Sequence, residues 1–162
     1  MQRSKIGEFL ILFSSIIICQ LAGIIGSIFT TPAIPTWYAN INKPTFRPPN
    51  WVFAPVWTTL YLLMGIALFL VLRKGFNEKG IKIAVAVFAL QLVLNSLWSF
   101  LFFGLESPFA AFIEIIFLWA AILISIILFF RISWVAGALL IPYILWVSFA
   151  SVLNFSIWRL NM

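Results

Sequence analysis

Long apolar runs, separated by short polar or proline-rich segments, dominate the chain. Five runs stand out, at about Gly7–Phe29, Val52–Leu72, Ile83–Phe103, Pro108–Phe130 and Trp134–Trp158. A helix needs roughly 20 apolar residues to cross a hydrocarbon core about 30 Å thick. Helices also satisfy their own backbone hydrogen bonds, which lipid cannot do. The pattern therefore predicts an all-α, polytopic membrane protein, a bundle of five transmembrane helices in a single domain over residues 1–162.

The connections between the runs differ in length. Residues 104–107 and 131–133 form tight turns, residues 73–82 form a short basic connection, and residues 30–51 form a long loop. Only the long loop has room for a structure of its own. Because the first run is longer than the apolar core of a signal peptide, we expect a retained anchor there.

Composition agrees with a lipid environment. The chain is 64% hydrophobic and 9% charged, whereas soluble domains carry about 25% charged residues. Its formal charge is +6, but the basic residues stand at the ends of apolar runs instead of forming a stripe, so we expect no nucleic-acid partner. Cys19 is the only cysteine, which excludes an internal disulfide.

Five spans place the two chain ends on opposite sides of the membrane, and the basic residues divide unequally between those sides. Seven fall on the amino-terminal side, namely Arg3, Lys5, Arg73, Lys74, Lys79, Lys82 and Arg131. Three fall on the other side, namely Lys43, Arg47 and Arg159. The positive-inside rule then predicts a cytoplasmic amino terminus and an outside proline-rich loop, in a cell membrane that we expect to be bacterial.

Small residues on the first run repeat at every fourth position, in the pairs Ala22/Gly26 and Gly23/Ser27. Such spacing lets another helix backbone approach closely in lipid. It is compatible with an intramolecular seam and with a dimer face.

Several kinds of chemistry lack their residues. The chain has no histidine, one cysteine and four acids, namely Glu8, Glu78, Glu106 and Glu114. Zinc sites, histidine-based triads and bis-histidine haem ligation are therefore not expected. We expect no metal and no required cofactor.

The long loop and the start of the second span hold the densest cluster of aromatic and proline residues. Residues 37–57 contain three of the eight tryptophans, Trp37, Trp51 and Trp57, and six of the eight prolines lie between 32 and 55. Because proline restricts the backbone, this loop can form a stiff lid at the membrane surface. Lys43 and Arg47 would add positive charge beside exposed aromatic faces. The alternative is an interfacial aromatic belt.

Two spans carry polar side chains at helical spacing. Phe88, Gln91, Asn95, Trp98 and Phe102 share one face of the third span, and Tyr143, Trp146, Ala150 and Asn154 share one face of the fifth. These polar groups could simply link helices. Inward indoles and amides on two helices, with space beside Ala150, also indicate a pocket.

Glu114 lies about six residues into the fourth span. An acid at that depth is a functional candidate. It could instead lie near the outer headgroups or pair with Arg159.

Three ordered motifs make the chain resemble the TspO/MBR family of tryptophan-rich sensory proteins and translocator proteins (peripheral benzodiazepine receptors), over nearly its whole length. They are Trp37-Tyr38…Lys43-Pro44…Pro48-Pro49-x-Trp51-x-Phe53-x-Pro55-Val56-Trp57-x-x-Leu60-Tyr61, then Asn95-x-x-Trp98-Ser99, then Pro142-Tyr143-x-x-Trp146-x-x-Phe149-Ala150-x-x-Leu153-Asn154. The resemblance implies a five-helix bundle, usually a homodimer, with a ligand cavity under the first loop.

What the family binds sets the expected ligands. The resemblance implies porphyrins such as protoporphyrin IX, isoquinoline carboxamide and benzodiazepine-type drugs, and, in animals, cholesterol. Carried over to this chain, it implies a pocket lined by Trp51, Asn95, Trp98, Trp146, Phe149, Ala150 and Leu153. The animal sterol motif needs a tyrosine where this chain has Phe155, so we do not expect cholesterol to be a principal ligand.

Three functions are compatible with these features. The first is a membrane-embedded tetrapyrrole-binding protein or sensor, in which indoles stack on the macrocycle and Lys43 or Arg47 pairs with its propionates. The second is an enzyme that degrades porphyrin with light and oxygen in the same pocket, with Trp51 and Trp146 as redox partners. The third is a small-molecule transporter, supported by Glu114 and the inward amides.

Overall fold

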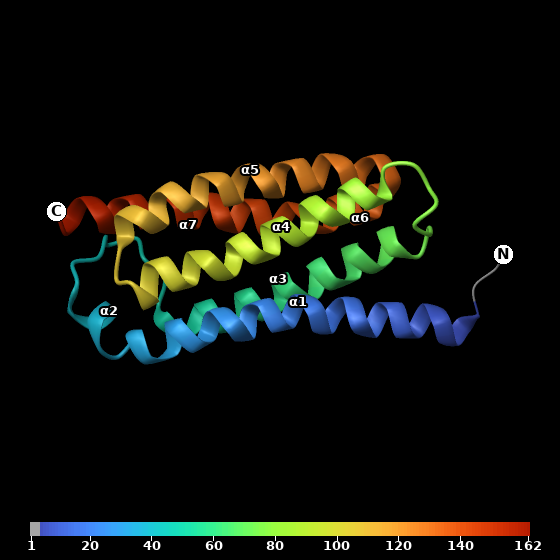
Figure 1. The fold of residues 1–162 in the computed structure, drawn as a ribbon. Helices are drawn as coiled ribbons and strands as arrows, with labels where there is room; N and C mark the ends of the chain where they lie inside the picture. Colours follow the sequence, from blue (N-terminus) through green and yellow to red (C-terminus); the bar gives the residue numbers. More distant parts are fainter. Residues whose placement is uncertain (1–3) are drawn as a thin grey trace.

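The computed structural model describes residues 4–162 as a bundle of long helices (Figure 1). Arg3, one of the seven basic residues counted above, lies outside the described residues. Five helical segments are long and apolar enough to cross a membrane: Lys5–Ala33, Asn50–Leu72, Ile81–Gly104, Pro108–Ile132 and Trp134–Leu160. The predicted five-helix membrane architecture is confirmed, and each predicted span lies within one of these segments.

Two of the five segments are interrupted. The third consists of α4 (Ile81–Ser99) followed by one turn of π-helix, η1 (Phe100–Gly104), and the fifth consists of α6 (Trp134–Leu139) and α7 (Ile141–Leu160). Pro142 lies in the first turn of α7. Its missing N–H costs no hydrogen bond there, because N–H groups in the first turn have no partner within the helix. The other segments are the continuous helices α1 (Lys5–Ala33), α3 (Asn50–Leu72) and α5 (Pro108–Ile132).

The beginning of α1 and the carboxyl end of α7 lie at opposite ends of the bundle (Figure 1). The loop between α1 and α3, with the short helix α2 (Trp37–Asn40), shares one end with the carboxyl terminus of α7. The basic connection between α3 and α4 lies at the other end, with the beginning of α1. These two connections therefore lie at opposite ends of the bundle, as the count of basic residues on the two sides of the membrane assumes.

The long connection is more helical than its composition predicts. α1 continues to Ala33 with Pro32 inside it, and α3 already begins at Asn50. The segment between them, residues 34–49, contains α2, and we call it the lid. A lid with a structure of its own is thus present, over a shorter range than the expected loop 30–51.

Small residues on α1 allow close contact within the bundle. A Cβ added to Gly26 would lie 2.9 Å from Ser99 Oγ, and one added to Gly23 would lie 2.4 Å from the Tyr61 ring. Ala22 is buried, and its carbonyl accepts a hydrogen bond from Ser96 Oγ at 3.1 Å. The small-residue repeat therefore serves an intramolecular seam with α3 and α4.

Candidate functional site: a cavity beneath the lid

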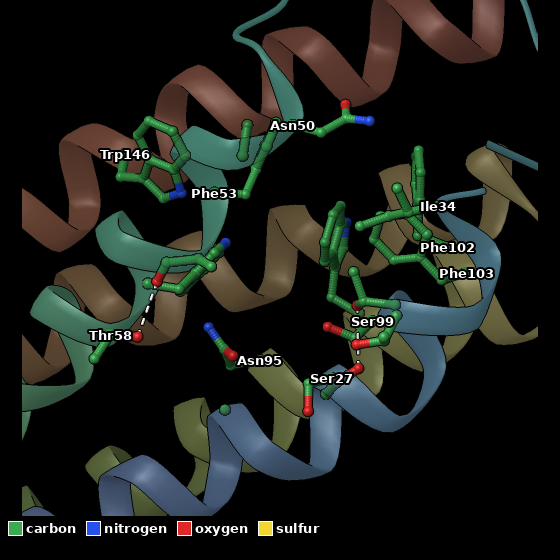
Figure 2. Close-up of a pocket in the computed structure, with 18 of the residues that line it drawn as sticks. Ser27, Ile34, Asn50, Phe53, Thr58, Asn95, Ser99, Phe102, Phe103 and Trp146 are labelled. Carbon is green, nitrogen blue, oxygen red and sulfur yellow. Dashed lines mark hydrogen bonds between the residues drawn. The ribbon is translucent and has the colours of Figure 1, made fainter. Parts of the chain in front are cut away.

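A cavity of about 370 Å³ lies at the lid end of the bundle, among α1, α2, α3, α4, η1 and α7. Trp146 and Phe53 enter it from α7 and α3, and Asn95 and Ser27 face it from α4 and α1 (Figure 2). Its volume falls within the roughly 300–1,000 Å³ of small-molecule sites. The location agrees with the cavity under the first loop that the resemblance to the TspO/MBR family implies.

Eight aromatic side chains line the cavity: Tyr38, Phe53, Trp57, Tyr61, Trp98, Phe102, Phe103 and Trp146. Many of them contact one another. The rings of Trp98 and Phe102 stack with centroids 5.1 Å apart, and Phe53 meets Trp146 edge to face at 5.9 Å. Such packing holds the rings in fixed orientations, so the cavity presents rigid apolar faces.

A chain of buried hydrogen bonds fixes the polar group at the floor of the cavity. Tyr61 Oη donates to Asn95 Oδ1, and Asn95 Nδ2 donates to Tyr143 Oη at 2.9 Å. Tyr143 Oη in turn donates to Gln91 Oε1 at 2.8 Å. Gln91 and Asn95 thus link α4 to α3 and α7, and Asn95 also lines the cavity. Asn95 therefore links helices and also forms part of the cavity wall, so both alternatives given for the polar face of the third span apply to this residue.

A second polar link holds Trp98 in place. Its Nε1 donates to Asn154 Oδ1 at 2.9 Å, and Asn154 Nδ2 donates to the Pro108 carbonyl at 2.7 Å. Asn154 therefore joins α4, α7 and the first turn of α5, and keeps the Trp98 ring in the cavity wall.

One buried donor in the wall has no partner. Trp146 Nε1 is inaccessible to solvent and makes no hydrogen bond to residues 4–162. A buried unpaired donor costs about 1–3 kcal/mol, so a rotation of the indole that gave this N–H an acceptor would relieve that cost.

The wall contributed by α1 was not anticipated from the sequence. Gln20, Ser27, Thr30 and Thr31 line the cavity, and Gln20 Nε2 reaches across to the Thr58 carbonyl of α3 at 3.1 Å. Gln20, Ser27 and Thr31 follow one another at seven and four residues, which places them on one helical face. This polar stripe in an otherwise apolar span is the signal that could have revealed the wall.

The two basic residues of the lid have different surroundings. Lys43 Nζ donates to the carbonyls of Tyr38 at 2.6 Å, Ile41 at 2.7 Å and Ala39 at 3.2 Å. An ammonium has three N–H donors, so all are engaged within the lid. Partial burial, and then the neighbouring Arg47 charge, lower the pKa of Lys43.

Arg47 also lies beside residues that line the cavity. Its Nη1 donates to Asn50 Oδ1 at 3.1 Å, and Asn50 lines the cavity. Burial raises the pKa of Tyr38, and the Arg47 guanidinium partly opposes that shift. Of the two predicted cations, Arg47 is the one with donors still free beside lining residues.

The structure separates the predicted site residues into two sets. Asn95, Trp98, Trp146, Ala150 and Leu153 line the cavity. Trp51, Phe149, Lys43 and Arg47 do not line it. Trp51 lies in the first turn of α3 and is 75% exposed, and the Phe149 ring packs against Trp146 from outside the wall, with centroids 5.5 Å apart. The expected lining by Trp51 and Phe149 is thus absent from this cavity.

Glu114 is buried in α5, with 7% of its surface exposed. Neither carboxylate oxygen has a hydrogen-bond partner among residues 4–162. Arg159 instead contacts Met162 Sδ at 3.4 Å, so the suggested pairing of Glu114 with Arg159 is wrong. Glu114 does not line the cavity either.

Comparison with known proteins agrees with this architecture. The model of the TspO/MBR family matches residues 15–159. The chain is 46% identical to the tryptophan-rich protein TspO of Archaeoglobus fulgidus, over 93% of this chain and 96% of the relative. It is 44% identical to the protein of the same name from Chlorobaculum tepidum, over 89% and 91%. It is 35% identical to the human translocator protein, over 88% and 85%. A five-helix membrane bundle, a cavity beneath a proline-rich lid and these matches over most of the chain lead to one conclusion: the protein belongs to the TspO/MBR family.

Proposed function

We propose that this protein binds a flat tetrapyrrole such as protoporphyrin IX in the cavity beneath the lid and acts as a membrane sensor of that ligand. Isoquinoline carboxamide and benzodiazepine-type compounds are proposed to occupy the same cavity. The observation that carries the proposal is the wall of eight aromatic side chains. Flat aromatic ligands stack on such faces with little loss of side-chain entropy, since neighbouring rings already hold these side chains in place.

Two polar features favour a ligand of this kind. A ring nitrogen or a carbonyl of the ligand can accept from the unpaired Trp146 N–H if the indole turns this covered atom toward the cavity when the ligand binds. Arg47, beside Asn50 at the mouth, can pair with a carboxylate that projects from the cavity. Since Lys43 has no free donor, the propionate-binding role proposed for the two cations falls to Arg47.

The host membrane and orientation form part of the same proposal. We propose a bacterial plasma membrane, an amino terminus in the cytoplasm and a lid facing outward, because most basic residues lie at the end of the bundle opposite the lid. The ligand would then reach the cavity from the outer side.

A second candidate function is the light- and oxygen-dependent degradation of porphyrin. Trp146 and Trp98 favour it, because both place easily oxidised indoles in the cavity wall. Trp51, the other expected redox partner, is 75% exposed on the outside of the bundle and does not line that wall.

One experiment tests both functions. Purified protein in detergent is incubated with protoporphyrin IX in darkness and in light, and the porphyrin absorbance is followed. Saturable binding in darkness with an unchanged pigment in light supports the sensor; a new pigment that forms only with protein supports the enzyme. No saturable binding would contradict both.

A matched pair of variants locates the binding site. Ala150→Phe places a ring inside the cavity, whereas Ala120→Phe places the same ring on the exposed surface of α5. We expect Ala150→Phe to weaken porphyrin binding at least tenfold and Ala120→Phe to leave it unchanged. Equal affinities would place the porphyrin elsewhere.

A further inference from the structure

The middle of the lid is a rigid unit. Lys43 Nζ binds three carbonyl oxygens of residues 38–41, at the carboxyl end of α2, and lies 5.1 Å from the centroid of the Tyr38 ring. A cation at a helix carboxyl end satisfies carbonyls that the helix itself leaves unpaired. Residues 38–43 therefore move together if they move at all.

This unit covers the cavity with Tyr38. Tyr38 lines the cavity and is 6% exposed. Its ring lies 5.7 Å from Phe103 and 6.3 Å from Phe102, measured between ring centroids. Lifting the unit away would separate these rings and open the cavity at its lid end.

The same unit is fastened to the end of α7 by an amide side chain. The Asn42 backbone N–H donates to Asn161 Oδ1 at 2.9 Å, and Asn161 Nδ2 donates to the Asn42 carbonyl at 2.8 Å. Asn161 Nδ2 also donates to the Ile157 carbonyl at 2.7 Å, which orients the amide on α7. The side chain of Asn161 thus pairs with the backbone of residue 42 as a neighbouring strand would.

These contacts join residues 119 positions apart in the chain. Residues 34–49 are otherwise joined to the bundle by their covalent links to α1 and α3 and by ring contacts, such as those of Tyr38 with η1 and of Phe46 with Phe149 of α7. The Asn161–Asn42 pair, which we call the clasp, is a polar attachment of the lid to a different helix. It lies at the outer end of α7, whose residues Trp146, Leu153 and Ile157 line the cavity.

We propose that Asn161 is a positioning residue that holds the lid closed, and that opening of the clasp sets the rate at which a ligand leaves the cavity. The first part concerns the free protein. The second part rests on the proposed function, because it requires a ligand in the cavity.

The geometry makes the two partners of the clasp unequal. Asn161→Ala removes both hydrogen bonds, because both use its side chain. Asn42→Ala keeps both, because they use the backbone of residue 42, and loses only the 3.3 Å bond from Asn42 Nδ2 to the Leu160 carbonyl. Asn40→Ala is the matched control, since Asn40 lies in α2 and its Nδ2 bonds only within the lid region, to the Thr36 carbonyl at 2.8 Å.

The first measurement needs no ligand. Amide hydrogen exchange at residue 42, followed by NMR, reports how often the clasp opens. Two neutral hydrogen bonds are lost in Asn161→Ala, so we expect exchange there to rise about tenfold. Exchange should change less than about twofold in Asn42→Ala and Asn40→Ala. An unchanged exchange rate in a folded Asn161→Ala variant would contradict the proposal that Asn161 holds the lid closed.

Asn161→Asp is a second variant for the same measurement. It keeps an acceptor for the Asn42 N–H but replaces the donor Nδ2 by a carboxylate oxygen that faces the Asn42 and Ile157 carbonyls, so we expect exchange faster than in the native protein. An exchange rate equal to that of the native protein would show that the donor of Asn161 does not hold residue 42.

The second measurement is the rate at which protoporphyrin IX dissociates. Labelled protein loaded with the porphyrin is diluted into an excess of unlabelled, porphyrin-free protein, which captures the porphyrin that is released. We expect about tenfold faster dissociation from Asn161→Ala and native rates from Asn42→Ala and Asn40→Ala. Faster amide exchange with an unchanged dissociation rate would overturn the role of the clasp in ligand release. If protoporphyrin IX failed to bind the native protein, the proposed function would fail, whereas faster exchange in Asn161→Ala would still support the clasp.

Discussion

At the scale of single residues, the indoles of the site differ in what they can do. Trp146 lines the cavity and its N–H is buried without a partner among residues 4–162, Trp98 has its N–H bound to Asn154, and Trp51 is exposed on the outside of the bundle. The sequence places these three tryptophans in similar motifs and does not distinguish them. The difference arises from neighbouring helices, which decide whether an N–H is paired and whether a ring is covered.

Trp146→Phe separates stacking from the other properties of an indole. Phenylalanine keeps a stacking face but loses the N–H donor and is harder to oxidise. We expect porphyrin affinity to fall by about 1 kcal/mol, roughly fivefold in Kd, and any light-driven conversion to fall much further. Fluorescence titration in darkness and absorbance under illumination measure the two effects.

Trp51→Phe is the matched control, because Trp51 is 75% exposed and outside the cavity wall. We expect it to change neither quantity. A loss with Trp51→Phe as large as with Trp146→Phe would show that the lid brings Trp51 onto the bound ligand. If light-driven conversion of the porphyrin persisted in both variants, singlet oxygen in solution would be its cause and the indoles would have no part in it.

At the scale of helices, glycine sets how closely α1 and α3 approach. A Cβ added to Gly65 would lie 2.6 Å from the backbone Cα of Ile16, and backbone cannot move aside as a side chain can. We expect Gly65→Ala to destabilise the protein by about 1–3 kcal/mol by separating the two helices. Gly7→Ala is the control, because its Cβ would meet only Ser4 Oγ at 3.4 Å and alanine favours a helix. Thermal unfolding in detergent measures both; equal midpoints would refute the close contact.

The outer face of α7 carries residues of the altered sterol motif. Val152 and Phe155 are 57% and 42% exposed, and Arg159 is also exposed, so the altered sterol motif faces away from the cavity. We expect sterol to bind more weakly than porphyrin or isoquinoline carboxamide, and Phe155→Tyr to raise sterol affinity only if this motif acts. Binding of a labelled sterol to both proteins tests this. Submicromolar sterol affinity in the native protein would contradict the expectation.

The sequence predicts some of these elements much better than others. Hydropathy locates all five spans because lipid imposes the same length on each helix. Helical spacing also turns Gln91, Asn95, Tyr143 and Asn154 inward, and these four residues are buried. In contrast, the lid contacts depend on residues that only the fold brings together. No local sequence pattern shows that the ammonium of Lys43 donates all its hydrogen bonds to lid carbonyls, or that Asn161 forms hydrogen bonds with the backbone of Asn42.

At the scale of the whole molecule, the remaining question is which end of the bundle faces the cytoplasm. The structure puts the lid and the basic connection at opposite ends, so one observation at each end fixes the orientation (Figure 1). Asn40 in α2 and Asn77 in residues 73–82 are both exposed. The native Cys19 is fully buried, so single cysteines at positions 40 and 77 can be labelled against little background.

We expect a membrane-impermeant maleimide on intact cells to label Asn40→Cys and not Asn77→Cys. The physical reason is the excess of lysine and arginine at the end opposite the lid, which holds that end on the cytoplasmic side during insertion. Permeabilised cells should show labelling at both positions, which controls for the reactivity of each thiol. Labelling of position 77 alone on intact cells would reverse the orientation and put the clasp and the cavity mouth in the cytoplasm. Labelling of both would mean that the protein inserts in two orientations, in which case seven basic residues against three are too few to select one.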